Sequence, residues 1–415
     1  MNLSKCPLLL LAPLACFAFA GCDDDDVMES GADAAVDAAS LPDAASGPDG
    51  AAPDSHSGDA LALGPDAGVV TPACAPANPN TYPADSFAAN TANETLVLGK
   101  LAALNTAMAS VETDPAKTVS LPELEALFSG GADSLKAKTT AYYAAQVEGT
   151  NGVLGQYAAA SGSPSFMAGM TAGLWGTWIF NANGVDLRQQ TDKGFMAAVQ
   201  YKHLTELSRK ASVTPADVDG MVAIMNLTPA FPYDTPTDVG AAKYASRRSN
   251  RANPDNLYLT IKYASIRARA AAAKPVECAA DLASALATLR GAWEKALVTT
   301  TLFYAADTKK KLAAAATDAD RAAALHALGE GIGFIHGFKG LPVQDRIITD
   351  AQIDSVLAEL FAVAPQTPVT GLSVATPYRF LNDIAQPPRL DTAVALIKAV
   401  YGFTDAEVEG FKVNY

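Results

Sequence analysis

The chain has 415 residues, of which 49% are hydrophobic and 18% are charged, and its formal net charge is -14 at pH 7. This length allows two domains, or one large domain with appendages, because domains usually have about 100–200 residues. The excess of acidic residues argues against a nucleic-acid-binding protein, which normally carries a basic face, and against electrostatic adsorption to anionic lipid.

Residues 1–22 are typical of an export signal. Lys5 supplies a positive charge, a short apolar run follows over residues 8–20, and small residues directly precede Cys22. A run of this length cannot span a bilayer, which requires about 20 apolar residues in a helix. The ending resembles the lipobox of bacterial lipoproteins, which implies that Cys22 is lipidated and becomes the mature N-terminus. An ordinary secretory signal is the alternative for this segment, and Cys16 is the alternative acceptor.

Residues 23–80 are rich in Ala, Asp, Pro, Gly and Ser and have no apolar periodicity. Such a segment cannot bury enough apolar surface to offset its ordering entropy, so the composition predicts a disordered tether. Twelve acidic residues and no Lys or Arg lie between residues 23 and 72, whereas the chain beyond residue 72 carries 29 basic and 32 acidic residues. The strong negative charge therefore belongs to the tether, and the body over residues 81–415 is nearly neutral.

Cys74 and Cys278 are the two cysteines that remain beyond the signal and the lipobox. Two cysteines in an exported protein favour one disulfide, here between the end of the tether and the start of a distant helix. The alternative is a pair of free thiols.

The body is predicted to be all-α and built from helical bundles. From Glu94 to Val111, apolar residues recur at spacings of three and four, which marks one face of a helix. The sequences SLPE at 120–123 and TPAD at 214–217 each combine an N-cap residue with an early proline, as helix starts do. Further helices are expected at about 133–147, 166–180, 185–210, 253–273, 278–306, 318–338, 350–363, 372–385, 389–401 and 404–412. Three prolines within residues 227–238 indicate an internal boundary, which suggests two sub-bundles divided near residues 228–253.

Several short stretches resemble the imelysin-related helical lipoproteins of bacteria, particularly a largely uncharacterised branch of them. They are residues 81–87 (TYPADSF), 184–190 (GVDLRQQ), 193–198 (KGFMAA), 293–296 (WEKA) and 325–335 (LHALGEGIGFI). The resemblance implies an exported, bundle-built, all-helical lipoprotein. Imelysin itself carries a Gly-x-His-x-x-Glu motif linked to metal binding. The nearest match here is residues 201–206 (YKHLTE), where Tyr201 replaces the glycine, so the family's metal site is not matched in full.

Two His/Glu pairs are candidates for binding iron or another divalent metal. His203 and Glu206 stand three residues apart, and His326 and Glu330 stand four apart, so each pair shares one helix face. The alternative for each pair is an ordinary hydrogen-bonded contact. His336 falls off the face that His326 and Glu330 share, so the three residues cannot ligate one ion from a single helix.

Two further groups of residues are candidates for binding a partner or ligand. Lys243, Arg247, Arg248 and Arg251 form the densest basic patch, which would suit an anionic ligand or an acidic partner surface, or would simply be solvated. Trp175 and Trp178, near Phe180 and Met170, would line a ligand groove or belong to the bundle core.

Known catalytic motifs are missing from the sequence. It has no Gly-x-Ser-x-Gly, His-Glu-x-x-His, Cys-x-x-Cys or phosphate-binding Gly-x-x-x-x-Gly-Lys-Ser/Thr motif. We therefore expect a non-enzymatic binding or interaction module at the cell envelope, which is attached to a membrane through Cys22 and recognises an envelope protein or a small ligand. The alternatives are an imelysin-like metal or iron uptake protein and, third, a peptidase.

Overall fold

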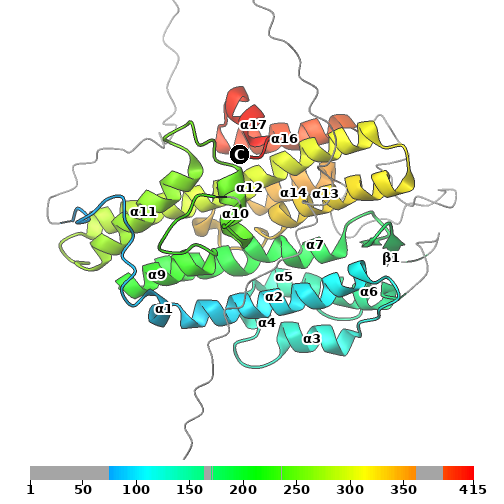
Figure 1. The fold of residues 1–415 in the computed structure, drawn as a ribbon, viewed down its shortest axis with the longest axis horizontal. Coiled ribbons are helices and arrows are strands. Elements are labelled where there is room, and N and C mark those ends of the chain that lie inside the picture. The colour runs from blue at the N-terminus through cyan, green and yellow to red at the C-terminus, as the bar shows by residue number, and fades with distance from the viewer. Residues whose placement is uncertain (1–73, 163–169, 171, 235, 361–386) are drawn as a thin grey trace, which may run out of the picture. The chain divides into compact units, whose positions relative to one another are not determined.

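The computed structural model describes residues 74–162, 170, 172–234, 236–360 and 387–415 (Figure 1). Cys22, the predicted tether up to residue 73 and the helix expected at 372–385 lie outside the described residues. In the part of the chain that is described, no helix is long and apolar enough to cross a bilayer. The described residues are mostly helical, as the sequence predicts.

The N-terminal half of the described chain contains short helices, one long helix and a hairpin. The elements are α1 (Phe87–Asn90), α2 (Ala92–Thr113), α3 (Leu121–Ser129), α4 (Leu135–Lys138), α5 (Ala141–Val147), α6 (Val153–Ala160), β1 (Ala172–Trp175), β2 (Trp178–Asn181), α7 (Leu187–Asp192), a π-helical turn (Met196–Tyr201), α8 (Lys202–Ser208) and α9 (Pro215–Ile224).

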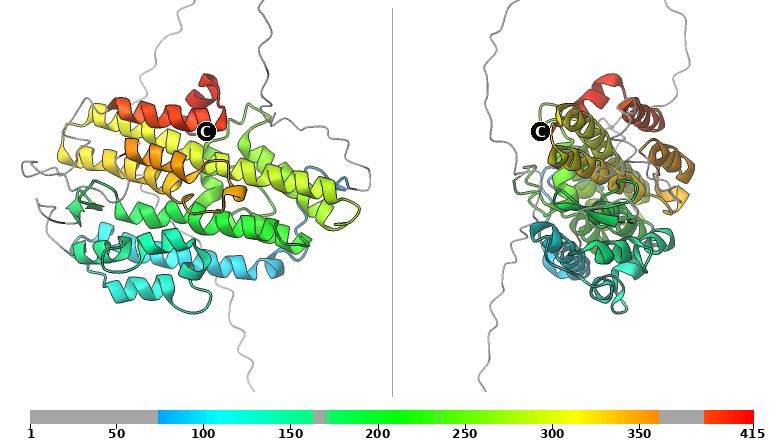
Figure 2. Two further views of the ribbon diagram at one scale, coloured as in Figure 1. Left: turned by 180° about the vertical axis from the view of Figure 1, so that it is seen from behind. Right: turned by 90° about the vertical axis from the view of Figure 1, so that its right-hand side faces the viewer.

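The C-terminal half contains the longest helix of the described residues. Its elements are α10 (Gly240–Arg247), α11 (Leu257–Ala272), α12 (Ala279–Ala314), α13 (Asp318–His336), a 3₁₀ turn (Val343–Asp345), α14 (Asp350–Glu359), α16 (Pro387–Tyr401) and α17 (Asp405–Phe411). Helix α12 packs most extensively against α11 and α13. Helices α7 and α9 lie between α2 and this group, because α7 contacts α2 and α13 while α9 contacts α2 and α11 (Figures 1 and 2).

Local capping signals place several helix starts where the sequence predicts them. Ser120 accepts a hydrogen bond from the backbone N–H of Glu123, whose side chain returns to the backbone of Ser120, so a complete capping box opens α3. Thr214 and Asp217 form the same reciprocal pair at the start of α9, with proline in the first turn. Each box satisfies N–H groups that otherwise have no partner within the helix, which is why these boundaries are readable from sequence.

The helix expected at 166–180 is wrong over its described part. Strands β1 and β2 form an antiparallel hairpin there, in which Trp175 pairs with Trp178 and Ala172 with Asn181. Gly176 has a φ of +63°, so the two-residue turn uses a conformation that glycine adopts without strain. The aromatic residues of this segment suit a strand as well as a helix, which is why apolar spacing alone misassigns it.

The expected boundary near residues 228–253 falls inside the one compact unit that contains all the described residues. Helix α10 lies in this segment and packs against α11 and α12. Ring stacking holds the preceding loop, since Tyr233 lies over Tyr258 of α11 with 4.4 Å between ring centroids. The Tyr258 hydroxyl also donates to Asp238 at 3.1 Å. The proline-rich loop is therefore attached to α11 at two points.

A disulfide joins Cys74 to Cys278, with 5.6 Å between their Cα atoms. It attaches the first described residue to the start of α12. A second link is made by the buried Asp219 of α9, which accepts hydrogen bonds from Tyr82 at 2.6 Å, Asn90 at 2.7 Å and Arg269 at 2.8 Å. The N-terminal segment is thus fixed to the helices by a covalent bond and by a buried carboxylate.

Three glycines on one face of α13 allow the α7 segment to approach at backbone distance. A Cβ atom at Gly329 would lie 2.6 Å from Cβ of Asp186, and one at Gly333 would lie 2.9 Å from Cβ of Lys193. Gly337, one turn further, faces Gly194 and Ala197 in the same way. These contacts leave no room for a side chain, so the spacing of four residues between the glycines determines how closely the two segments pack.

We predict that Gly333→Ala destabilises the fold by about 1–3 kcal/mol, because the new methyl group collides with the backbone carbonyl of Gln189. Gly291→Ala on α12 is the matched control, since nothing lies within 4 Å of its Cβ position. It should be neutral or stabilising by up to about 1 kcal/mol. Urea unfolding of both variants checks the prediction, and equal effects at the two positions would contradict it.

Candidate functional site

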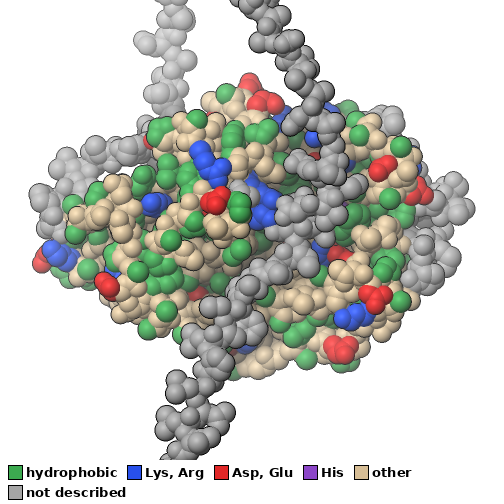
Figure 3. All heavy atoms as spheres, viewed as in Figure 1, with side chains coloured by type: hydrophobic (Ala, Val, Ile, Leu, Met, Phe, Trp, Pro, Cys, Tyr) green, Lys and Arg blue, Asp and Glu red, His purple; other side chains and the backbone are tan. Residues whose placement is uncertain are grey.

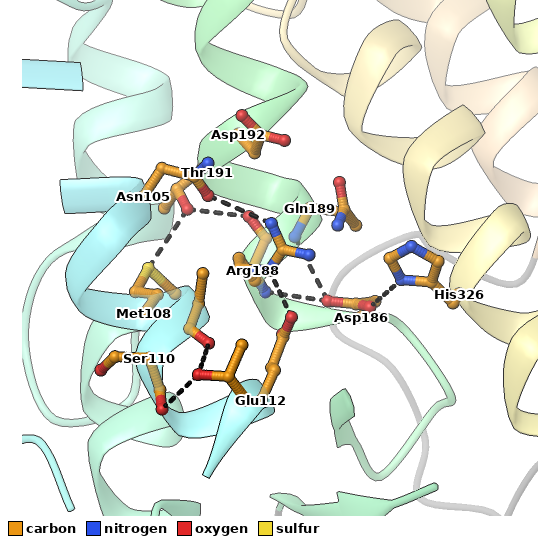
Figure 4. A network of polar contacts seen from close by, with 12 residues as sticks. Asn105, Met108, Ser110, Glu112, Asp186, Arg188, Gln189, Thr191, Asp192 and His326 are labelled. Carbon is orange, nitrogen blue, oxygen red and sulfur yellow. Dashed lines mark hydrogen bonds and ion pairs between the residues drawn. The ribbon is translucent and has the colours of Figure 1, made fainter. Parts of the chain in front are cut away.

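The described histidines all lie in polar contacts inside the helical body. His326 of α13 is buried, and its Nδ1 lies 2.8 Å from Oδ2 of Asp186. Asp186 is the N-cap of α7, where its other carboxylate oxygen accepts from the backbone N–H groups of Arg188 and Gln189. One fully buried carboxylate therefore starts α7 and binds α13 at the same time (Figure 4).

The hairpin covers the other side of this contact. The Trp178 ring stacks on the His326 imidazole with 4.6 Å between centroids and an interplanar angle of 17°. Trp175 is 8% exposed and packs edge-on against Phe180. The sequence analysis placed the two tryptophans either in a ligand groove or in the core. Trp175 is in the core, and Trp178 lies against His326. Hairpin, α7 and α13 thus meet at one imidazole ring.

Arg188 continues the network toward α2. Its Nε donates to Oε2 of Glu112 at 2.6 Å, and Nη1 donates to the Asn105 side chain at 3.3 Å (Figure 4). Arg188 and Glu112 are both buried. Losing one member of a buried ion pair is strongly destabilising, because the other charge stays out of water without its partner.

At the C-terminal end of α7, Lys193 connects two acidic residues. Its Nζ lies 2.8 Å from Asp192 and 3.3 Å from Oε1 of Glu330. Burial disfavours the ionised form of Asp192, but the charges of Lys193 and Arg188 outweigh it and lower the pKa of that carboxyl. Glu330, a metal-ligand candidate in the sequence, therefore lies beside a lysine ammonium group.

The environment of His326 favours its charged form. Burial by itself lowers the pKa of this imidazole, but the hydrogen bond to Asp186 and the negative charges of Glu330 and Asp186 raise it above the usual value. The carboxylate also fixes the orientation of the ring. The network can hold a proton on His326 and connects four elements, α2, α7, α13 and the hairpin.

His203 has a partner that the sequence did not indicate. Its Nε2 lies 2.8 Å from Oε1 of Glu94 on α2, whereas Nδ1 lies 4.0 Å from Glu206. Glu206 is half exposed and pairs with Lys202 at 2.5 Å. No spacing rule links residues 109 positions apart, so only the packing of α2 against α8 and α9 could reveal Glu94. Within the described ranges, no group of three or more His, Cys, Asp or Glu side chains could hold a metal ion.

The basic patch is mostly buried instead of forming a charged surface. Lys243 is 6% exposed, Arg247 7% and Arg248 2%, while Arg251 is exposed and lies over the Tyr233 ring. Arg248 Nη1 donates to the backbone carbonyl of Phe411 at 2.7 Å. The expectation of an accessible patch is therefore wrong for the first three residues, because they pack inside the body and one of them binds the C-terminal segment.

Glu294 is a buried anchor that the sequence analysis did not identify as such. Its carboxylate accepts from the backbone N–H groups of Ile347 and Ile348, at 2.7–3.0 Å, and from the Tyr401 hydroxyl at 2.7 Å. Burial raises the pKa of Glu294. The residue connects α12 to the loop before α14 and to the end of α16. Glu294 belongs to residues 293–296 (WEKA), one of the stretches that carry the resemblance. Its contacts give this glutamate a structural role.

The described surface has a groove between α12 and α16. Its lining residues are Ala305, Ala306, Lys309, Lys310, Ala313, Leu390, Asp391, Val394 and Lys412, and its volume is about 330 Å³. Elsewhere, charged side chains of both signs are scattered over the face seen in Figure 3, without one dominant field.

His336 gives a pH-dependent prediction. Burial, together with the charge of Lys339, lowers its pKa to about 4, and the neutral ring suits its contacts with Gln190 and Tyr142, both at 3.0 Å. In the unfolded chain a histidine titrates near 6.5, so between pH 6.5 and about 4 the unfolded state binds one more proton and stability falls as the pH falls.

We expect wild-type protein to lose about 2 kcal/mol more than His336→Gln between pH 6.5 and 4.5 in urea unfolding. His326 is present in both proteins, so its own titration cancels from the comparison. Identical pH slopes for the two proteins would contradict the assignment.

Comparisons with known proteins give no relative. No family model matches the chain, and no curated protein and no solved structure matches it either. The resemblance to imelysin-related lipoproteins stays a prediction from short sequence motifs. The described residues themselves establish a helical body with a buried polar network, a disulfide and one lysine-lined groove among the features described above.

Proposed function

We propose that this chain is an exported, lipid-anchored helical protein that acts as a non-enzymatic binding module at the cell envelope. The anchor is Cys22, which follows a short apolar run and small residues, and the acidic segment after it serves as a tether. In this proposal the membrane lipid holds the protein in place, and the helical body recognises a partner or a small ligand.

The observation that carries the proposal is the disulfide between Cys74 and Cys278. Disulfides persist in oxidising compartments such as the periplasm and the cell surface, and they are rare in the cytosol. The bond lies where the tether meets the helical body, so it also supports a role for the preceding segment as a connection to an anchor. Both features agree with export.

A binding role is supported by where polar groups lie in the described body. His203, His326 and His336 are each engaged with side chains of the body. The groove between α12 and α16, by contrast, presents lysines and apolar side chains to solvent. Recognition at this surface requires no catalytic group.

The anchor is tested by expressing the full chain in a bacterium and labelling it with radioactive palmitate. We expect label in the wild-type protein and in Cys16→Ser, and a membrane-bound mature form of both. Cys22→Ser should lose the label and leave the membrane fraction. Cys16→Ser is the matched control because it removes the alternative acceptor from the same signal segment.

The oxidised state is measured on the same purified protein. Thiol titration in denaturant without reductant should find no free thiol from Cys74 or Cys278, and two after reduction. Label that persists in Cys22→Ser, or two free thiols in the wild-type protein before reduction, would overturn the proposal of an exported lipoprotein.

A further inference from the structure

Arg290 of α12 is a half-buried arginine that makes no ion pair with any residue that the structure describes. Its Nη1 donates to the Ser208 hydroxyl at 3.1 Å, and that hydroxyl donates in turn to the backbone carbonyl of Thr205 at 2.8 Å. The Nε and Nη2 groups have no hydrogen-bond partner among the described residues, and they are not enclosed in the core. One edge of a fixed guanidinium group is therefore open to a ligand.

A second arginine lies beside Arg290 and already has a counter-charge. Arg209 follows Ser208 in the chain, and its side chain pairs with Asp345 and donates to the backbone carbonyl of Gln344. Burial and the positive charge of Arg209 lower the pKa of Arg290, because both disfavour its protonated form. Two arginines and one aspartate leave one positive charge without a contact that balances it.

Glu294, the acidic residue one turn after Arg290 on α12, is used by other groups. Its carboxylate accepts from the backbone N–H groups of Ile347 and Ile348 and from the Tyr401 hydroxyl. It makes no ion pair with Arg290, although residues four apart lie on the same helix face. Glu294 therefore holds the loop before α14 and does not cover the open edge of Arg290.

The open edge determines which chemical group can bind. The Nε and Nη2 groups of an arginine direct parallel N–H bonds to the same side, so two oxygen atoms of one group accept from both. A carboxylate supplies two such oxygens and a single negative charge, which matches the one unbalanced positive charge. A phosphate dianion would bring a second negative charge into the neighbourhood of Asp345, which repels it.

We propose that Arg290 binds the carboxylate group of a ligand through its Nε and Nη2 groups. Ser208 holds the guanidinium group in place, and the charge of Arg209 strengthens the attraction. This inference rests on the proposed function, because it gives the binding module a ligand class. The site lies between α8 and α12, about four helical turns before the residues of α12 that line the groove with α16.

The affinity is measured on the purified full chain with acetate as the probe, in saturation-transfer NMR titrations at pH 7 and constant ionic strength. One bidentate contact at a half-exposed site supports a weak affinity, so we expect a Kd of about 1–30 mM for acetate. Inorganic phosphate should bind more weakly than acetate under the same conditions.

Variants test which part of Arg290 is needed. Arg290→Gln removes the charge and should weaken acetate binding at least about tenfold, whereas Arg290→Lys keeps the charge without the parallel donors and should weaken it about threefold to fivefold. Arg267→Gln is the matched control. Arg267 of α11 is also half-buried without an ion pair to a described residue, but no hydrogen bond to a described residue holds its side chain. This variant should leave the affinity unchanged.

Chemical labelling localises the anion in the wild-type chain, so it does not depend on whether a variant folds. Phenylglyoxal modifies accessible arginines, and peptide mass spectrometry follows each position separately. Acetate at about 100 mM should slow the modification of Arg290 at least about threefold relative to chloride at the same ionic strength. The modification of Arg267 should proceed at the same rate in both salts.

The proposal is overturned if acetate does not bind, if it protects Arg290 and Arg267 equally, or if Arg290→Gln binds acetate like the wild-type protein. Phosphate that binds as tightly as acetate, or more tightly, would reject the carboxylate as the ligand group. Because palmitate labelling of Cys22 does not involve Arg290, its outcome separates failure of this site from failure of the envelope-anchored module.

Discussion

The contact between α7 and α13 is the constraint on which the rest of the described body depends. Gly329 and Gly333 give α7 a surface without side chains, so that the backbone of one segment meets the other helix directly. At this distance the N-cap carboxylate of Asp186 reaches His326, and the imidazole in turn supports the hairpin through Trp178. Any side chain on that glycine face would separate these groups.

Close packing of this kind removes charged side chains from water. Ion pairs between these side chains have to offset the hydration that is lost. Arg188 is neutralised by Glu112, His326 by Asp186, and Glu330 by Lys193. Such pairs add little net stability compared with well-packed apolar residues, but breaking one leaves an uncompensated buried charge. We infer that the network specifies one arrangement of α2, α7 and α13 more than it strengthens the fold.

Local signals predicted the helical class and many helix boundaries, because capping boxes and apolar periodicity act within a few residues. The hairpin at Trp175 and Trp178 was not predicted, since its aromatic residues suit both kinds of structure and its turn depends on Gly176. The resemblance motifs contained Asp186, Glu294 and His326 but gave no indication of their partners. Those partners come from distant helices, so they follow from tertiary packing.

The same limit explains the candidate sites. His203 was paired with Glu206 by helix spacing, but it binds Glu94 from another helix. The spacing of the basic residues in and after α10 suggested an accessible charged patch. Most of them are buried, because α10 packs against α11 and α12. The groove between α12 and α16 joins residues of α12 to residues about 80 to 100 positions later, and no motif marks it.

The central claim, that the Asp186–His326 contact couples α7 to α13, is tested by a double-mutant cycle. Asp186→Asn, His326→Gln and the double variant are unfolded in urea at pH 6, where His326 is charged in the folded protein. The account predicts a coupling free energy of about 1–3 kcal/mol between the two residues. Single-variant effects that add to within about 0.5 kcal/mol in the double variant would contradict it.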